Sequence, residues 1–473
     1  MRYRRLLVWF RRDLRLHDNP ALHAACSDAD EIVPVAFVSS LDNGSEASGA
    51  REVFRLGSVA CLDGELRRRG GYLVLLDGDA AEGLPALLHS ARAQGMYHER
   101  SWDPEARTTD QRVARAVREA GGVVCEFPGR TVHEPDALRT GAGRPFTVFT
   151  PFYRAWSALP IEPPLPPPAT LRCAEGLGRV RFANGQVIAS FAPGEPAGRT
   201  ALNAFVEQRL ASYARKRDML AVDGTSRLSP HLAAGTISAR EVVWTVQRAM
   251  ESMGEGDRES ARVFISEIAW RDFFYHVLYH YPGAVERSFR PELSDIAWVN
   301  DAAMLSAWQE GRTGYPVVDA AMRQLLAEGW MHNRARMVTA SFLTKDLLID
   351  WRQGERWFMR QLIDGDVASN TGGWQWSAGT GTDAQPYFRV FNPVTQGRRF
   401  DPDGAYVRRF VPELARVPAH AIHEPWRMTA AEQSVAACRI GRDYPEPIVD
   451  HARQRLEAVR VYREAAGRYR GGA

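Results

Sequence analysis

The sequence predicts an α/β doubly wound parallel sheet followed by an all-α domain. Short apolar stretches alternate with helical patterns over roughly the first 130 residues. A proline-rich stretch follows, and from about Ala197 onward the apolar spacing is helical. Because 473 residues suffice for two domains with large cores, we expect an α/β domain over residues 1–130, a connector over 131–196 and a helical domain over 197–473.

The predicted strands are short apolar runs, namely Leu6–Phe10, Ile32–Val38, Tyr72–Leu76, Met96–His98 and Val123–Phe127. Between them, helical patterns cover Pro20–Cys26, Arg51–Arg68, Ala80–Ala93 and Glu105–Ala120. Strands that alternate with helices pair in parallel, and such sheets often bind nucleotides at the strand ends. No Gly-x-Gly-x-x-Gly follows the first strand, so the dinucleotide fingerprint is absent.

A polar loop, Arg11–Asn19, leads from the first predicted strand to the first predicted helix. Asn19 is an expected N-cap, and Pro20 suits the first position of a helix. On physical grounds alone, we expect paired Arg and Asp side chains that staple the loop.

The connector is rich in proline. Six prolines lie close together, at Pro160, Pro163, Pro164, Pro166, Pro167 and Pro168, and Gly and Pro recur up to Pro196. Such a segment is stiff and extended. Proline-rich motifs also dock adaptor domains, but in a chain of this length we expect a spacer.

Composition excludes several classes of protein. The net charge of +3 is too small to predict a nucleic-acid partner. The five cysteines form no metal-binding spacing, which indicates reduced, mostly buried thiols. The N-terminus lacks the apolar core of a signal peptide, and no run approaches the ~18 apolar residues of a membrane span. We therefore expect a cytoplasmic protein without metal or membrane.

One candidate site is the stretch Gly224–His231. Ser229 precedes Pro230 and is expected to cap a helix there. The free N–H groups of that helix, the hydroxyls of Thr225 and Ser226, and Arg227 suit an anionic phosphate. An ordinary capped helix is the alternative interpretation.

A second candidate is the predicted helix Ser260–Tyr281, where Phe264, Glu267, Trp270, Arg271 and Phe274 recur at steps of three and four on one face. Charges among aromatic side chains cost free energy unless they are partnered. Either Glu267 and Arg271 pair within the helix, or both face a polar ligand in a cleft.

A third candidate is Gly329–Met337. Asn333, Arg336 and Met337 share one helix face, and Arg334 is turned about a quarter-turn further round. An amide beside a thioether suits a flat heteroaromatic ring. We expect His332 to be a structural hydrogen bonder, because no HExxH motif, catalytic-triad order or Cys/His cluster is present.

The last candidate is Asp364–Trp376, where two acids flank a glycine and Asn370, two glycines and two Trp residues follow. These residue types suit a planar ligand with polar edges, and the alternative is a glycine-rich loop over an aromatic core. The second half of the chain is also rich in Trp. Core packing is the default for each indole, although a packed row of them can relay electrons to a buried redox cofactor.

Five motifs together identify a resemblance. They are Phe10–Arg15, Thr225–Pro230, Arg312–Pro316, Trp330–Arg334 and Asp364–Trp376. In order and spacing the chain resembles the photolyase/cryptochrome family from residue 5 to about residue 427, and it looks closest to bacterial class I cyclobutane-pyrimidine-dimer (CPD) photolyases.

The resemblance implies an α/β antenna domain and a helical domain that binds FAD. The residues that would line the flavin are Tyr213, Thr225, Ser226, Arg227, Leu228, Ser229, Phe264, Arg271, Asn333, Arg336, Asp364, Gly365, Asp366 and Asn370. It also implies that Arg336 pairs with Asp364, and that Asn370 lies by the flavin N5 and stabilises the neutral or fully reduced ring. Trp374, Trp351 and Trp298 match the three-tryptophan chain that photoreduces the flavin.

For DNA, the resemblance implies that Trp270 and Trp376 flank a flipped pyrimidine dimer. Glu267, Asn333 and Met337 would touch its bases, and Glu267 would also stabilise the dimer radical anion. Arg217 and Arg334 would lie on the rim that faces DNA. A lesion buried in a duplex must be flipped out to be reached, and aromatic walls and phosphate contacts then hold it without reading sequence.

The implied activity is repair of UV-damaged DNA by electron transfer from photoexcited FADH⁻, in a protein expected to be a monomer. The alternative is a cryptochrome-like blue-light sensor without repair. The chain ends soon after Arg470 without a long tail, Asn370 stands where plant sensors tend to carry an acid, and Asn333 with Met337 gives the dimer-type pattern where (6–4) enzymes carry histidine. All three features favour dimer repair.

Two departures from the family pattern concern ligands. Where folate-binding members often carry an Asn-Glu pair, this chain has Asp103-Pro104-Glu105-Ala106. The antenna is therefore a folate, a deazaflavin, another flavin or nothing. Phe264 is Trp in some relatives, a change that keeps a flat packing surface.

Overall fold

The computed structural model describes residues 2–38, 49–174, 176–177, 191–384 and 386–471. By its internal contacts the chain forms two compact units, one of Met1–Ala214 with Thr225–Pro282 and one of Arg215–Gly224 with Gly283–Ala473. Residues 178–190 of the predicted connector lie outside the described residues. The predicted domain boundaries stay a prediction.

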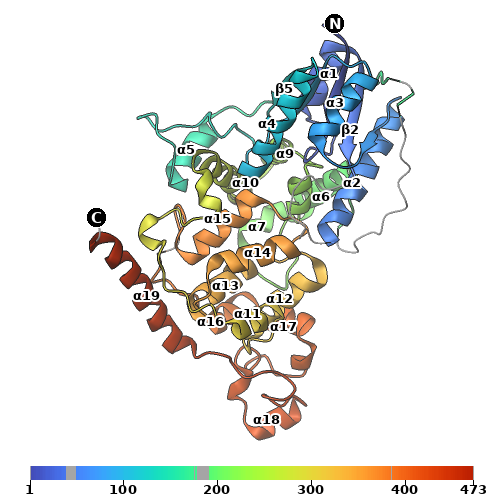
Figure 1. Cartoon of the computed structure of the whole chain (residues 1–473). Coiled ribbons are helices and arrows are strands. Elements are labelled where there is room, and N and C mark those ends of the chain that lie inside the picture. The colour runs from blue at the N-terminus through green and yellow to red at the C-terminus, as the bar shows by residue number, and fades with distance from the viewer. Residues whose placement is uncertain (1, 39–48, 175, 178–190, 385, 472–473) are drawn as a thin grey trace. The chain divides into compact units, whose positions relative to one another are not determined.

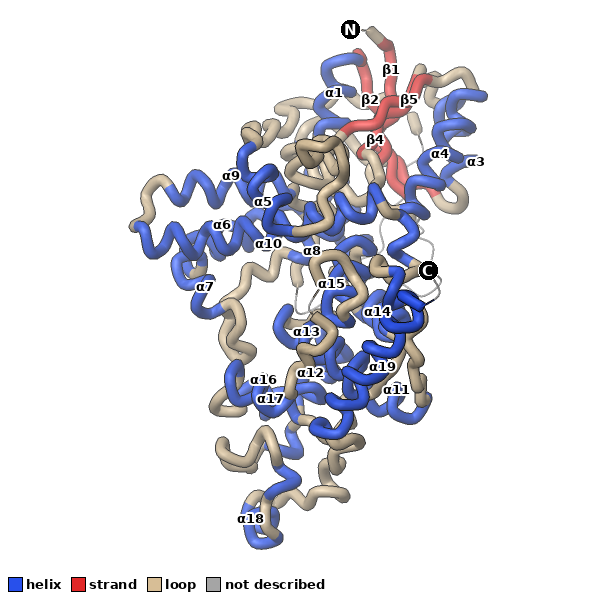
Figure 2. The backbone as a smooth tube through the Cα atoms, turned by 90° about the vertical axis from the view of Figure 1, so that its left-hand side faces the viewer, coloured by secondary structure: helices blue, strands red, loops and turns tan. Residues whose placement is uncertain are grey.

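The first unit contains a five-stranded parallel sheet (Figure 2). Its strands are β1 (Tyr3–Trp9), β2 (Ala29–Phe37), β3 (Val74–Leu76), β4 (Gly95–Glu99) and β5 (Val123–Phe127). Their order is β3-β2-β1-β4-β5, with Leu7 paired to Val33 on one side and to Met96 on the other. The predicted doubly wound sheet is confirmed. The chain reverses its direction of winding between β1 and β4, which is where open α/β sheets bind ligands.

Helices cover both faces of the sheet (Figure 1). They are α1 (Pro20–Asp28), α2 (Gly49–Arg68), α3 (Ala80–Ser90) and α4 (Pro104–Glu119). Because strand side chains alternate between faces, Leu6 and Val8 of β1 pack with residues of α1 and α2. Leu7 and Trp9 pack with residues of α3 and α4. Each predicted strand and helix of this part is present, with ends shifted by a few residues.

The remaining elements are helices. Those that begin in the first unit are α5 (Phe149–Ala158), α6 (Glu195–Gln208), η1 (Leu210–Ser212), α7 (Tyr213–Lys216), α8 (Ser229–Ala234), α9 (Ala239–Met250), α10 (Glu255–His280) and η2 (Pro282–Val285). Those of the second unit are η3 (Pro291–Leu293), α11 (Ala302–Gln309), α12 (Pro316–Glu328), α13 (Asn333–Ser341), η4 (Phe342–Asp346), α14 (Trp351–Gln361), α15 (Val367–Ala378), α16 (Pro393–Phe400), α17 (Ala405–Phe410), η5 (Pro412–Leu414), η6 (Pro425–Arg427), α18 (Ala430–Val435) and α19 (His451–Gly471).

The core of the second unit centres on α12 and the segments around it. Asp319 of α12 is fully buried and accepts hydrogen bonds from the backbone N–H groups of Thr313 (2.7 Å) and Gly314 (3.0 Å). The Tyr444 hydroxyl also donates to it at 2.5 Å. A buried carboxylate needs such partners. The motif Arg312–Pro316 is therefore anchored in the core of this unit.

All five cysteines are free thiols. Cys438 is buried, but Cys26, Cys61, Cys125 and Cys173 are only half-buried, so the prediction of mostly buried thiols is wrong. Cys26, Cys125 and Cys173 pack against the apolar clusters of the sheet but are only partly enclosed by them. No helix among the described residues is long and apolar enough to cross a membrane.

Candidate functional site

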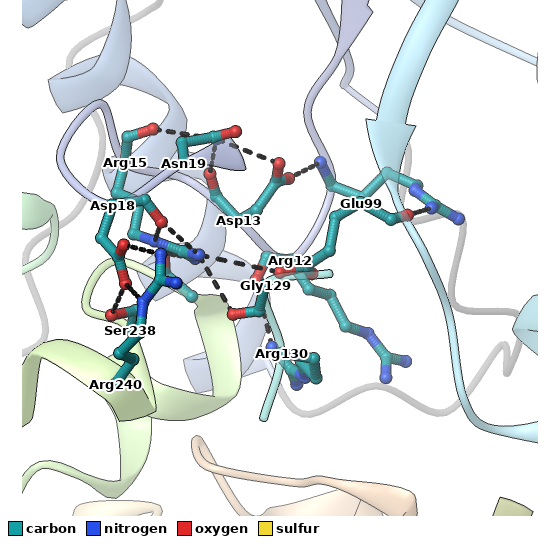
Figure 3. A network of polar contacts seen from close by, with 12 residues as sticks. Arg12, Asp13, Arg15, Asp18, Asn19, Glu99, Gly129, Arg130, Ser238 and Arg240 are labelled. Atoms are coloured by element: carbon teal, nitrogen blue, oxygen red, sulfur yellow. Dashed lines mark hydrogen bonds and ion pairs between the residues drawn. The ribbon is translucent and has the colours of Figure 1, made fainter. Parts of the chain in front are cut away.

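The loop after β1 is stapled by its own charged side chains (Figure 3). Arg15 donates to the carbonyls of Asp18 (3.0 Å), Gly129 (3.1 Å) and Gly235 (3.0 Å). Asp18 in turn accepts from Ser238 at 2.5 Å and forms an ion pair with Arg240. Asn19 caps α1 by accepting from the Leu22 N–H at 3.0 Å. The predicted Arg/Asp staple and the predicted N-cap are both confirmed.

Glu99 lies buried beside this loop, at the end of β4. Its Oε1 is 3.8 Å from Arg15, and no hydrogen-bond donor among the described residues reaches that oxygen. Burial, and next the charge of Asp13, raise the pKa of Glu99 to about 7. The first unit therefore carries a carboxyl group that binds a proton near neutral pH.

Two of the predicted flavin-lining residues of the first unit form an aromatic cluster. Tyr213 meets Phe264 edge-on, with ring centroids 5.2 Å apart, and both contact Phe205. Such edge and tilted contacts are the preferred geometry of packed aromatic rings. Tyr213 and Phe264 are buried, so their shared contact with Phe205 fixes the start of α7 against α10.

The predicted phosphate-binding stretch Gly224–His231 differs from expectation at the N-cap of its helix. Helix α8 begins at Ser229, and its N-cap residue is Leu228, which makes no side-chain hydrogen bond to the helix. The prediction of Ser229 as the N-cap is therefore wrong by one position. The reason is local, because Arg227 takes the left-handed conformation (φ 53°) and turns the chain one residue earlier. Leu228 is buried, whereas Thr225 and Ser226 are half-buried.

On α10 the charged residue Arg271 is tied to the chain that follows the sheet. Its Nη1 donates to the carbonyl of Arg130 at 2.7 Å, and its guanidinium lies 4.9 Å from the ring centroid of Tyr275. These contacts supply the partner that a charge among aromatic side chains needs. Glu267, one turn before Arg271, and Trp270, directly before it, are half-buried.

In the second unit, α13 begins within the third candidate stretch, Gly329–Met337, as expected. His332 caps the helix, because its Nδ1 accepts from the Arg334 N–H at 3.1 Å. Burial lowers the pKa of His332 to about 4, so the ring is neutral and able to accept. The expected structural role of His332 is confirmed. The Asn333 amide nitrogen lies 3.9 Å from the sulfur of Met337, one helical turn later, which places the two side chains on one face of α13.

Two arginines of α13 are held by acids. Arg336 forms the ion pair with Asp364 at 2.8 Å that the family resemblance implied. Arg334 pairs with Asp218 at 2.8 Å and lies over the Phe400 ring, 4.5 Å from its centroid. Planar guanidinium groups keep a fixed direction when they are paired and stacked in this way.

The stretch Asp364–Trp376 is mostly helical, so its interpretation as a glycine-rich loop is wrong. Asp366 caps α15 by accepting from the Ser369 N–H at 2.9 Å. Gly379, with φ 84°, ends the helix in the left-handed conformation. A capped helix of twelve residues tolerates Gly372 and Gly373 because its ends and its packing stabilise it.

Asn370 is held by a residue that sequence analysis missed. Its Nδ2 donates to the backbone carbonyl (3.0 Å) and to Oε1 (2.8 Å) of Glu355 on α14. The donor side of the amide is thereby used, which leaves Oδ1 as the acceptor that Asn370 offers to a ligand. Glu355 is half-buried, and burial raises its pKa.

The predicted tryptophan chain lies wholly in the second unit. Trp351 and Trp374 are buried and Trp298 is half-buried. The described rings next to Trp374 are Phe358, 4.9 Å away, and Trp308, 6.0 Å away, both edge-on. Trp308 is therefore a core residue whose ring lies next to Trp374, a member of the predicted electron path.

The comparisons with known proteins agree with this architecture. Residues 264–464 match the family model described as the FAD binding domain of DNA photolyase, and residues 6–169 match the one described as DNA photolyase. A domain with a parallel α/β sheet and a helical FAD-binding domain together define this class of flavoprotein.

The full chain has close relatives. It is 41% identical over 471 residues to the deoxyribodipyrimidine photo-lyase of Agrobacterium fabrum, with 97% of each chain covered. A class III photolyase structure from Agrobacterium tumefaciens matches with a TM-score of 0.92 at 39% identity, covering 98% of both chains. A Synechocystis cryptochrome matches with 0.88 at 31% identity, covering 96% of this chain and 98% of that one. The chain belongs to the photolyase/cryptochrome family.

FAD is the cofactor, and the second unit offers groups that fit it. Asp364 Oδ1 is buried, and no donor among the described residues reaches it. Buried acceptors are rarely left unpaired, so this oxygen suits a hydroxyl or N–H group of a ligand. The adjacent ion pair with Arg336 keeps the Asp364 side chain in place. No group of His, Cys, Asp or Glu among the described residues is arranged to hold a metal ion.

Proposed function

We propose that the protein is a light-driven DNA repair enzyme that splits cyclobutane pyrimidine dimers in UV-damaged DNA. The observation that carries this proposal is the similarity, over nearly the full length, to a relative named deoxyribodipyrimidine photo-lyase. The class III photolyase structure also matches with a higher TM-score and identity than the cryptochrome. A cytoplasmic location and a monomeric state belong to the same proposal. Membership of class I stays a prediction, because the photolyase structure that matches with a TM-score of 0.92 is a class III enzyme.

The chain's own residues would bind and orient the lesion. Trp270 and Trp376 are half-buried indoles that offer flat faces to a flipped dimer. Asn333 and Met337 share one face of α13 and combine an amide with a soft apolar contact for the pyrimidine edges. Glu267 would hydrogen-bond the dimer and balance charge that develops on it.

Two arginines are proposed to lie on the rim of the site and to contact DNA. Arg334 is held by Asp218 and Phe400, so its guanidinium can meet a phosphate without a large loss of side-chain entropy. Phosphate contacts of this kind position the strand and read no sequence, which suits a substrate defined by damage. Arg217 is proposed to act on the same rim.

The cofactor residues have separate tasks. Reduced FAD, when bound, supplies an electron to the lesion after it absorbs light. The Arg336–Asp364 pair and the hydroxyls of Thr225 and Ser226 would bind its polar groups. Asn370, with its amide nitrogen directed to Glu355, presents an acceptor oxygen and so favours a protonated ring nitrogen. Trp374, Trp351 and Trp298 remain the proposed route for electrons that restore the reduced state.

An antenna chromophore is proposed for the α/β part. Trp9 Nε1 and His98 Nε2 are buried near the ends of β1 and β4, and no partner among the described residues reaches either nitrogen. Buried polar nitrogens without a partner, at the switch point of a parallel sheet, suit a polar ligand. Folate, deazaflavin and flavin all offer acceptors for such groups.

Binding in the dark tests the proposal. The purified holoprotein is titrated with a duplex that contains one thymine dimer and with an undamaged duplex of the same sequence. We expect at least about tenfold tighter binding to the damaged duplex, because a damaged base costs less to flip and gains stacking on two indoles. A flavin-loaded protein that binds both duplexes equally would contradict repair and favour a sensor.

A further inference from the structure

Trp270 is held in an unusual way by a neighbouring helix. Phe149 of α5 lies flat against it, with ring centroids 3.8 Å apart and an interplanar angle of 11°. Phe273 and Phe274 approach the same indole at 5.6 Å with steep or tilted planes. One face of the indole is thus covered by Phe149, and Trp270 remains half-buried.

The stack continues along α5. Tyr153 lies one turn after Phe149 and stacks on it at 5.6 Å and 15°, and Trp156 stacks on Tyr153 at 6.1 Å and 23°. These rings recur at steps of four and three, which places them in one row on the helix. Figures 1 and 2 show α5 beside α10, the helix that carries Trp270.

Both ends of this row are fixed to α10. At one end is Trp270 itself. At the other end, the Trp156 Nε1 donates to Asp272 Oδ2 at 3.0 Å, and both residues are buried. Asp272 also accepts from the backbone N–H of Val132 at 2.9 Å. Because α5 is tied to α10 at two points, the plane of Phe149 cannot slide relative to Trp270.

The stack of Phe149 on Trp270 is closer than parallel stacking in the core, since the buried rings of Trp308 and Phe358, at the same angle of 11°, lie 5.9 Å apart. Packed aromatic pairs prefer offset or edge-to-face contacts with wider centroid distances. On the same helix, Phe152 follows that preference, since it meets Phe273 at 5.1 Å and 53°. Phe152 is fully buried, whereas Trp270 and Tyr153 at the margin of the unit are half-buried. The flat stack therefore involves a half-buried indole and not the fully buried part of the aromatic cluster.

We propose that Phe149 is a positioning residue for the lesion, which sets the plane of Trp270 so that the opposite face of the indole receives the flipped pyrimidine dimer. This inference rests on the proposed function, since it assigns the lesion to Trp270. Tyr153 and Trp156 support Phe149 from behind. A base stacks well only on a ring whose orientation is fixed beforehand, because ordering the ring on binding would cost affinity.

Four variants test the inference. Phe149→Leu keeps an apolar side chain and removes the flat ring, whereas Phe149→Tyr keeps the ring. Phe152→Leu is the matched control: it also removes a phenylalanine ring from α5, but this ring contacts Phe273 and not Trp270. Trp270→Leu removes the indole. For each holoprotein, dissociation constants are measured in the dark for dimer-containing and undamaged duplexes, together with the thermal midpoint and flavin content.

We expect Phe149→Leu to weaken binding of the damaged duplex about tenfold and to leave the undamaged duplex within twofold. Phe149→Tyr should restore the preference for damage, and Phe152→Leu should lower the thermal midpoint without changing that preference. The inference is overturned if Phe149→Leu keeps the preference while Trp270→Leu loses it. If Trp270→Leu also keeps it, the lesion site assigned to Trp270 falls as well.

Discussion

At the residue scale, the structure adds most around Asn370. The residue type and its place in the motif Asp364–Trp376 were enough to select Asn370 from sequence. Its partner Glu355 lies fifteen positions earlier on another helix, and no local pattern links the two. Sequence reasoning identifies a polar group near a ligand, but the direction of an amide depends on tertiary contacts.

The contact between Glu355 and Asn370 yields a prediction about the flavin. Replacing Glu355 with Leu removes the side-chain acceptor of the Asn370 amide and leaves only the backbone carbonyl. Under the role proposed for Asn370, the variant should therefore lose much of its stabilisation of the reduced ring. One hydrogen bond to a charged group is worth about 1.5 kcal/mol or more, and we expect reduced flavin to reoxidise in air roughly tenfold faster. The measurement is the return of oxidised-flavin absorbance after the reductant is removed.

Glu355→Gln provides the matched control, because its side-chain oxygen can still accept from Asn370. Reoxidation should then stay close to that of the parent protein. Equal reoxidation rates in the Leu variant and the parent would show that Glu355 does not orient Asn370.

At the element scale, α15 shows where propensity fails. Two adjacent glycines and a polar start left a glycine-rich loop open as an alternative, yet Asp366 caps the helix and Gly379 ends it. Glycine propensity is a weak prior that packing overrides. By contrast, α13 and α10 were predictable, because their apolar and polar residues keep helical spacing over several turns.

The packing of α14 on α15 depends on Gly354. A Cβ at this position would meet Leu343 Cδ2 and Trp374 Cζ3 at 2.5 Å. Gly354→Ala should therefore lower the free energy of unfolding by roughly 1–3 kcal/mol, since overpacking outweighs the gain in helix propensity. Denaturant unfolding followed by circular dichroism measures the change.

Gly373→Ala on α15 is the matched control. Nothing lies within 4 Å of a Cβ there, so this variant should gain up to about 1 kcal/mol from helix propensity. The close approach of the two helices would be refuted if both alanine variants were stabilised alike.

At the scale of the whole molecule, the alternation of strands and helices predicted the parallel sheet. The strand order β3-β2-β1-β4-β5 did not follow from local patterns, because it depends on which strands meet in space. The same limit applies to the charged loop after β1. Its Arg and Asp residues predicted a staple, while the partners Gly129, Gly235 and Arg240 lie far along the chain.

The buried Glu99 gives the fold a pH dependence. Its pKa rises from 4.5 to about 7 on folding, so the folded state holds the proton more tightly. The stability that this proton contributes is fully present below pH 4.5 and is lost as the pH rises through 7. Glu99→Gln should therefore be more stable than the parent above pH 7, by roughly 1–3 kcal/mol, with a difference that shrinks towards pH 5.

Unfolding free energies measured from pH 5 to 8 test this expectation. Glu126→Gln removes a carboxyl group at an exposed position on β5 and serves as the reference for the general effect of a Glu→Gln change in this sheet. A flat difference for Glu99→Gln would mean that Glu99 stays ionised in the folded protein.

The most direct test of the central claim is light-driven turnover. The holoprotein is reduced, mixed with an excess of DNA that carries cyclobutane thymine dimers, and illuminated with blue light. The account predicts that each protein molecule converts many dimers to intact thymines, that matched samples in the dark convert none, and that no reductant is consumed per dimer. Flavin-loaded, reduced protein that leaves the dimers intact under light would contradict it.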